Sequence, residues 1–432
     1  MNKGKHARVA TLSVVGRSIR LLAGPITLLL ISKQLSSAEV AFYYTFFSVI
    51  SMQQLAELGM GHVIKQYISH AYKLDIANLW TIDSKLEIRK YFYFSMLWFL
   101  GVSIFVLIIV GLAGYYYFSL STSSISWQGA WLGLVVASAI STLLSPIQFF
   151  IDGIQQQEKL LFANIISSFV NAFSLWACLI YGAGLYSISI SLLLSTFALY
   201  VVVFPTFKYW LKKIKIDNNK IDYKSVLIKI LPLLSKVSLV WGLGFLFWNG
   251  FNFVSFSELN ANEAGKIIFA IALARAGFGI AESITQGQTT IFSNLISENK
   301  YFIARSEFSK YCYISMCLLA VGYALFYLAW YLFPSFYVFN KIPSKLIVFE
   351  IFIFFIIQLY KTLRTNFIRN FKVEPFVKPS IFEALSLPIF FYIGIKVNVE
   401  IAFLMSILVI VIGFIWALWI EKKFIGSNVN AE

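Results

Sequence analysis

The sequence predicts an all-α integral membrane protein, with twelve transmembrane helices in two bundles of six. Three observations predict this fold class. Hydrophobic residues make up 59 % of the 432 residues and charged residues only 13 %, whereas soluble domains carry about 25 % charged residues. Twelve apolar stretches are each long enough to cross a bilayer, which takes about 20 helical residues. One long polar connection divides these stretches into six and six.

The predicted spans follow one another with short connections. Their approximate limits are 9–33, 38–69, 91–118, 128–154, 161–182, 184–207, 226–254, 263–295, 309–333, 344–367, 376–396 and 398–420. Several are longer than the minimum, as expected of helices that tilt or extend beyond the bilayer. The apolar run near the N-terminus contains arginines and lacks a small-x-small cleavage site, so we expect it to be retained as the first span.

Basic residues in the connections predict that both termini face the cytoplasm. With this orientation, most of the 35 lysines and arginines fall in cytoplasmic connections, which are enriched in basic residues in membrane proteins. The connections on the other side contain only Lys33, Lys266, Lys341, Lys345 and Lys396. The basic run KYWLKKIKIDNNK, residues 208–220, therefore fits a loop near anionic lipid headgroups better than a nucleic-acid site.

The longest polar connection predicts the domain organisation. This linker, residues 208–225, separates an N-terminal six-helix bundle, residues 1–207, from a C-terminal one, residues 226–432. The first span of each bundle contains a proline, Pro25 or Pro232. Interrupted helices at matching positions of two halves indicate a transport site near the bilayer midplane. Six spans in each half would make the halves parallel repeats.

Short motifs recur at matching places in the two halves. Residues 35–44 read LSSAEVAFYY and residues 259–268 read LNANEAGKII, so each has Leu-x-x-x-Glu before a long helix. Residues 158–165, EKLLFANI, and 374–381, EPFVKPSI, both precede the fifth span of their half. Because the matches agree in order and position, they indicate an internal duplication.

Several ionisable side chains fall inside the predicted spans, where a charge near the bilayer centre costs at least about 2.5–3.5 kcal/mol. The basic candidates are Arg17, Arg20, Lys65, Lys229, Lys236, Arg275 and Lys361, and the acidic candidates are Glu57, Asp152, Glu282 and Glu350. Helical spacing places Arg275, Gly279 and Glu282 on one stripe. The surplus of basic groups indicates an anionic ligand.

Two structural interpretations of these charges stay open. Long basic side chains near helix ends can extend to the headgroups, which suits Lys229 best and Arg275 least. Opposite charges can also form structural pairs, such as Arg275 with Glu282 or Lys65 with Glu57.

The sequence lacks the motifs of an enzyme active site. It contains no phosphate loop, nucleophile elbow or metal signature, and its three histidines and three cysteines lack metal-ligand spacing. We therefore expect a protein that is not an enzyme and that binds no cofactor or metal. Without an ATP-binding domain, a proton or sodium gradient, the substrate gradient or downstream consumption would drive it.

Several features near the N-terminus match a known family. They are Pro25, the Leu-Ser-x-x-Glu turn at 35–39, the aromatic start of the next span at 42–44, and the element ELGM at 57–60, followed by Lys65. These features, together with SPIQFFIDGIQQQEKLLFANII at 145–166, resemble the O-antigen flippase (Wzx) type of the multidrug/oligosaccharidyl-lipid/polysaccharide (MOP) exporter superfamily. The chain departs from the pattern in having Ala41 where glycine is usual, although the second copy has Gly265, and Glu57 where aspartate is common.

The resemblance implies a MATE-like fold, whose two bundles form a V-shaped cavity that opens alternately to either side of the bacterial inner membrane. It also implies a substrate, undecaprenyl pyrophosphate carrying a short oligosaccharide, moved from the cytoplasmic to the periplasmic leaflet. The expected partners are membrane lipid, this lipid-linked oligosaccharide and other polysaccharide assembly proteins, and not nucleic acid.

A lipid pyrophosphate needs protein groups to replace its water, and arginines do so with bidentate hydrogen bonds. We expect the pyrophosphate ligands to be Arg17, Arg20, Lys236 and Arg275, with Lys65 and Lys361 near the cytoplasmic mouth. Trp241 and Trp248 are candidates for stacking on sugars. The candidates for ion coupling or charge pairing are Glu57, Asp152, Glu282 and Glu350.

Three alternative functions are weighed against this one. A multidrug exporter for cations would carry net acidic charge in its cavity, and lipid II flippases typically have fourteen spans. A membrane-embedded glycosyltransferase or polysaccharide polymerase would need a catalytic carboxylate in a sizeable outer loop, and the outer loops here are short.

Overall fold

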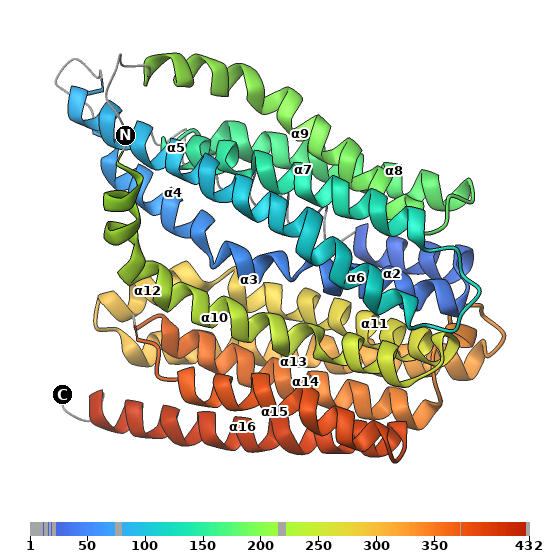
Figure 1. The fold of residues 1–432 in the computed structure, drawn as a ribbon. Helices are drawn as coiled ribbons and strands as arrows, with labels where there is room; N and C mark the ends of the chain where they lie inside the picture. Colours follow the sequence, from blue (N-terminus) through green and yellow to red (C-terminus); the bar gives the residue numbers. More distant parts are fainter. Residues whose placement is uncertain are drawn as a thin grey trace. The chain divides into compact units, whose positions relative to one another are not determined.

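A computed structural model describes residues 12, 16, 19, 23–73, 80–214, 222–371 and 373–428. Over these residues every regular element is a helix and none is a strand (Figure 1). Nine of the described helices are long and apolar enough to cross a membrane. The predicted all-α, multi-pass membrane class is therefore confirmed, whereas the count of twelve spans stays a prediction.

The chain forms two compact units. The first comprises Met1–Leu35 and Thr45–Phe245, and the second comprises Ser36–Tyr44 and Leu246–Glu432. One boundary between these units lies after Phe245, whereas the domain limits at the linker 208–225 stay a prediction.

Helix α10 (Tyr223–Glu258) explains the position of this boundary. Its first half belongs to the first unit, where Ile230 and Leu234 are buried in the hydrophobic core. Its second half belongs to the second unit, where Phe251 packs against other aromatic rings. A continuous helix of 36 residues is long enough to contribute to both cores, which the sequence pattern could not reveal.

The first unit is built mainly on helix α7 (Gln128–Gly153), which packs against α4 (Met60–Ala71), α5 (Ile82–Phe105) and α9 (Tyr186–Lys213). Helix α8 (Gln157–Ile180) packs along α9 (Figure 1). The remaining elements are a helical segment at residues 23–34, α3 (Gln53–Glu57), a π-helical turn (Val106–Val110) and α6 (Gly111–Ser119).

The predicted span 38–69 is wrong as a single helix. It is broken into α2 (Ser37–Ile50), α3 and α4, with turns at residues 51–52 and 58–59. Leu58 and Gly59 both have left-handed backbone conformations, with φ of 54° and 73°. Glycine adopts positive φ without steric cost and commonly ends a helix. The ELGM element that carries the family resemblance is therefore a helix break.

The second unit is an antiparallel set of long helices (Figure 1). Helices α14 (Lys345–Arg369) and α15 (Val377–Ile395) pack on α16 (Val399–Asn428), and α11 (Ala261–Gln286) packs on α13 (Tyr301–Leu332) and α14. Its other elements are α12 (Thr289–Ser297) and a 3₁₀ turn (Phe339–Lys341). Aromatic rings fill its core, for example Phe391 against Phe251 and Phe403.

The repeated Leu-x-x-x-Glu motifs are helix starts. At the first, the Glu39 carboxylate accepts from the Ser36 N–H at 2.8 Å and the Ser36 hydroxyl accepts from the Glu39 N–H at 3.2 Å, which is a reciprocal capping box. At the second, the Asn260 side chain accepts from the Glu263 N–H at 3.0 Å. Each of the two motifs therefore caps the start of a helix, α2 or α11.

Candidate functional site

Three of the predicted pyrophosphate ligands lie outside what the structure describes. Arg17 and Arg20 are not among the described residues, and Lys236 lies in α10 with an undescribed side chain, as does Trp241. Their roles stay predictions. The fourth, Arg275, is described and lies in the second unit.

The Arg275 guanidinium stacks on an aromatic ring. Its central carbon lies 4.4 Å from the ring centroid of Trp248, on the second half of α10. The Arg275 side chain is exposed, and it forms no ion pair with any described carboxylate. The suggested pair with Glu282 is absent from the described part of the chain, where the Glu282 carboxylate instead accepts from Gln286 at 2.8 Å.

The helix face around Arg275 is open. No described atom outside the helix would lie within 4 Å of a Cβ at Gly279. The predicted stripe of Arg275, Gly279 and Glu282 therefore faces away from the packed interior of the second unit. At its Arg275 end this stripe combines a guanidinium without a described carboxylate partner, open space and the neighbouring Trp248 ring of α10, which suits a binding surface for an anion. The Glu282 carboxylate lies two turns further along the helix.

Lys361 is buried and paired. Its side chain is 9 % exposed and its ammonium is bonded to Glu383 on α15, whose side chain is 7 % exposed. The Lys361 ammonium also lies 5.5 Å from the ring centroid of Phe247. The structure thus places this lysine inside the second unit with its charge balanced, not at an open mouth. Sequence reasoning missed Glu383, although a carboxylate inside the predicted span 376–396 was the available signal.

A second ion pair lies nearby along α14. Arg364 donates to both carboxylate oxygens of Glu421 on α16, at 2.7 and 2.8 Å, and to the Tyr360 hydroxyl at 2.6 Å. Bidentate pairs of this kind hold two helices in a defined orientation. Together with Lys361 and Glu383, this pair ties α14 to α15 and α16, so these charges stabilise the unit.

Glu350 differs from the other acids. It is 5 % exposed on α14, and its Oε2 atom has no hydrogen-bond partner among the described residues.

In the first unit, Lys65 pairs with Asp152 at 2.5 Å rather than with Glu57, and 41 % of the Lys65 side chain stays exposed. Glu57 lies at the end of α3, beside the helix break. Its carboxylate accepts from Gln53 at 3.2 Å, and the Gln53 side chain in turn accepts from Thr142 at 3.2 Å. Asp152 and Glu57 are therefore each held by a specific partner.

Known structures provide a comparison for the fold. The chain is similar to an inward-facing multidrug resistance MATE family transporter of the MOP superfamily, with a TM-score of 0.67, 13 % identity, and coverage of 96 % of this chain and 99 % of that one. The chain has a MATE-like fold. Sequence comparison adds nothing further, since neither a protein-family model nor a curated protein matches.

Two further structures share this MATE-like fold. The lipid II flippase MurJ, in an inward closed conformation, gives a TM-score of 0.67 at 14 % identity and covers 96 % of this chain and 87 % of that one. A MOP superfamily transporter from Pyrococcus furiosus gives a TM-score of 0.51 at 14 % identity, with coverage of 96 % and 95 %. The MATE-like fold predicted for the chain is thus confirmed, and its substrate is a separate question.

Proposed function

We propose that this MATE-like protein is a flippase of the O-antigen (Wzx) type. It would move an undecaprenyl-pyrophosphate-linked oligosaccharide from the cytoplasmic to the periplasmic leaflet of the bacterial inner membrane by alternating access. Both termini would face the cytoplasm. The observation that carries the proposal is the exposed Arg275 guanidinium, which stacks on Trp248 without a carboxylate partner in the described chain.

The position of the Arg275 charge indicates that the surface around it is water-filled and binds a ligand. A guanidinium facing lipid near the bilayer centre would cost at least about 2.5–3.5 kcal/mol, and Arg275 has no described carboxylate to reduce this cost. Stacking on Trp248 holds the guanidinium plane while its N–H groups stay free to donate. A planar fork of donors suits the oxygens of a phosphate or pyrophosphate.

The other basic candidates complete the proposed site. Arg17, Arg20 and Lys236 would join Arg275 as pyrophosphate ligands, and Lys65, which is partly exposed beside Asp152, would lie nearer the cytoplasmic side. Lys361 is left out of the binding set because Glu383 already neutralises its charge in the interior. Glu57, Glu282 and Glu350 stay candidates for coupling to a proton or sodium gradient.

The polarity of the stripe separates this proposal from a cation exporter. The MATE neighbour is a multidrug resistance transporter, and a cavity for cationic drugs needs unpaired acidic groups. On the stripe of α11 the Glu282 carboxylate accepts a hydrogen bond from Gln286, whereas the basic Arg275 has no described carboxylate partner. Another neighbour is a lipid II flippase, so lipid II is the nearest competing cargo.

Deletion of the gene in its host tests the proposal. We expect lipid-linked repeat units to accumulate on the cytoplasmic face, as measured by their protection from a membrane-impermeant glycosidase in spheroplasts, and to become accessible again upon complementation. Accessible single units that are not polymerised would instead indicate a polymerase. Accumulated lipid II would indicate a lipid II flippase, and unchanged saccharides with increased drug sensitivity would indicate a drug exporter.

A further inference from the structure

The first unit contains a hollow of about 710 Å³ formed by α4, α5 and α10, and several charged side chains line it. Its volume lies within the range of about 300–1,000 Å³ typical of small-molecule sites. Three lining residues lie at or just after the end of α4, namely Tyr67, His70 and Lys73. The others that matter here are Asp83, Glu87 and Tyr91 on α5 and Lys229 on α10. All of them belong to the first unit.

The hollow lies at the predicted cytoplasmic ends of its helices. Helix α5 begins at Ile82, nine residues before the limit predicted for its span, and this extension carries Asp83 and Glu87. Helix α4 ends at Ala71, and α10 begins at Tyr223. The hollow is therefore expected at the level where a lipid-linked saccharide projects from the cytoplasmic leaflet.

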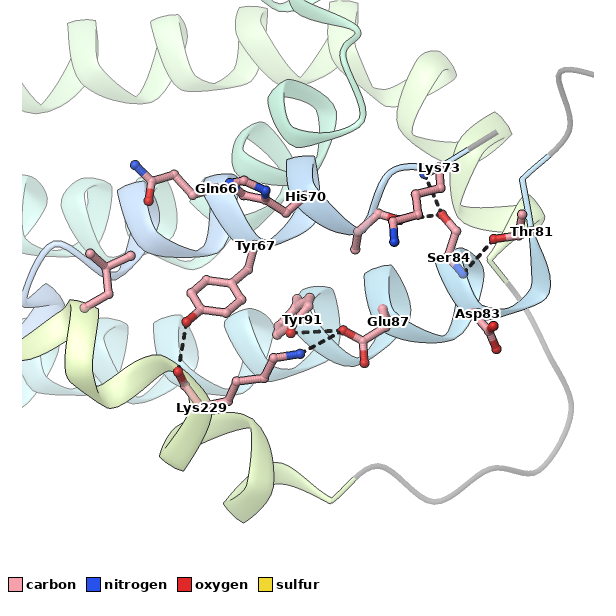
Figure 2. A pocket seen from close by; sticks show the side chains of 12 residues that line it. Gln66, Tyr67, His70, Lys73, Thr81, Asp83, Ser84, Glu87, Tyr91 and Lys229 are labelled. Carbon is pink, nitrogen blue, oxygen red and sulfur yellow. Dashed lines mark hydrogen bonds and ion pairs between the residues drawn. The ribbon is translucent and has the colours of Figure 1, made fainter. Parts of the chain in front are cut away.

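One wall of the hollow is held in place by a hydrogen-bond network (Figure 2). The Tyr67 hydroxyl donates to the backbone carbonyl of Lys229 at 2.8 Å. The Lys229 ammonium and the Tyr91 hydroxyl both donate to the Glu87 carboxylate, at 3.2 and 3.0 Å. The rings of Tyr67 and Tyr91 lie 5.2 Å apart. This network links all three helices and fixes two aromatic rings in the wall.

Three polar side chains of the hollow outside this network are open to a ligand. Asp83, His70 and Lys73 are exposed, and in the described chain neither the Asp83 carboxylate nor the Lys73 ammonium forms an ion pair. In Figure 2, His70 lies on α4 and Asp83 near the start of α5, and no dashed line joins either to the network of Tyr67, Tyr91, Glu87 and Lys229. A ligand that both donates and accepts hydrogen bonds would find an acceptor in the Asp83 carboxylate and a donor in the Lys73 ammonium.

The balance of charge indicates what kind of ligand fits. The described lining carries two carboxylates and two ammonium groups, and one of each is already paired as Glu87 with Lys229. A multiply charged anion would lie beside carboxylates, whereas a neutral polyhydroxyl compound can hydrogen-bond to both signs of charge. The partly exposed Tyr67 ring also offers an apolar face to the C–H surface of a sugar ring, while the buried Tyr91 supports it from behind.

We propose that this hollow binds the oligosaccharide part of the substrate on the cytoplasmic side, before the pyrophosphate reaches Arg275. The proposal rests on the flippase function for the identity of the saccharide. It assigns the sugar and the pyrophosphate to separate places on the chain, the first to α4, α5 and α10 in the first unit, and the second to α11.

Binding to the purified full-length protein tests the proposal without transport. The probe is the oligosaccharide released by mild acid from the host's own lipid-linked repeat units, tritiated and measured by equilibrium dialysis. Asp83→Ala should raise the Kd by about tenfold or more, as expected for the loss of a hydrogen bond to a charged group, and His70→Ala should weaken binding as well. The control is Lys85→Ala, which alters α5 outside the hollow and should bind as the unsubstituted protein does.

Competition with glycerol 3-phosphate distinguishes a saccharide site from a phospholipid headgroup site. No displacement supports the proposal, whereas displacement that depends on Lys73 would overturn it. Absence of saccharide binding, or unchanged binding in both hollow variants, would also overturn it. The binding assay requires no transport, so its outcome is independent of the deletion experiment. If saccharide binding fails these tests while repeat units accumulate on the cytoplasmic face of the deletion strain, only the proposed saccharide site in the hollow is rejected. Normal periplasmic units in that strain would reject the flippase function.

Discussion

Gly265 on α11 packs directly against the backbone of Ser37 at the start of α2. A Cβ atom at residue 265 would overlap the Ser37 carbonyl group and lie 3.3 Å from the Ala41 nitrogen. Nearby, the rings of Phe42 and Phe256 meet edge to face at 4.9 Å. The two repeated motifs thus begin helices that touch each other in one unit.

This contact predicts that Gly265→Ala destabilises the protein. The added methyl group has to displace backbone rather than a flexible side chain, and overpacking of this kind costs typically about 1–3 kcal/mol. Thermal unfolding in detergent should give a lower Tm. The matched control is Gly279→Ala on the same helix, where no described atom lies within 4 Å of the added carbon; equal Tm values for the two variants would contradict the packing.

Arg275→Ala should reduce export of repeat units by about tenfold or more at normal protein level, because a charged bidentate contact to phosphate is removed. Arg275→Lys should be intermediate, since a lysine keeps the charge but loses the planar fork. Export is measured as surface polysaccharide labelled in a pulse. Lys422→Ala, an exposed change near the end of α16, serves as the control. Full export by Arg275→Ala would remove this residue from the substrate site.

The pair of Lys361 and Glu383 predicts strong coupling between two helices. Because both side chains are buried, Lys361→Met or Glu383→Leu alone leaves an uncompensated charge and should cost about 3–5 kcal/mol. The double variant should recover most of this loss, since an apolar pair of similar volume fits the same space. A double-mutant cycle on unfolding free energy measures the coupling, and simple additivity of the two losses would argue against a direct pair.

The helix break after α3 predicts which substitutions of Gly59 the protein tolerates. Its φ of 73° is strained for most residues, so Gly59→Ala should cost about 1–2 kcal/mol. Gly59→Asn should cost less, because asparagine adopts the left-handed conformation more readily. The Tm values of the two variants are compared in the same detergent. A Tm for Gly59→Ala at or above that of Gly59→Asn would indicate that the break is not required.

The sequence predicted best those features that depend only on residues close together along the chain. Apolar length predicted the positions of most helices, as in α7 (Gln128–Gly153) against a predicted span of 128–154. The capping residues Ser36 and Asn260 also lie within the repeated motifs that precede long helices, because a cap needs only residues three positions apart. Local periodicity failed at 38–69, where Leu58 and Gly59 interrupt an apolar run that otherwise reads as one span.

Charged partners could not be predicted in the same way. The sequence suggested Glu57 as a partner for Lys65 and Glu282 as a partner for Arg275, because those residues lie two turns or so apart along a predicted span. The structure pairs Lys65 with Asp152 on α7 and Lys361 with Glu383 on α15. Each true partner comes from another helix, and only helix packing brings it within bonding distance.

The sequence by itself determined that this chain is an all-α membrane protein with a repeated helix-start motif and an excess of basic groups in its spans. Composition and local spacing suffice for those properties. Only the tertiary structure decided which charges are neutralised inside a unit, that the Arg275 charge stays exposed beside Trp248, and how α4, α5 and α10 form a hollow lined by charged side chains. These depend on residues as far apart as Tyr67 and Lys229, whose contact arises from packing and leaves no pattern along the chain.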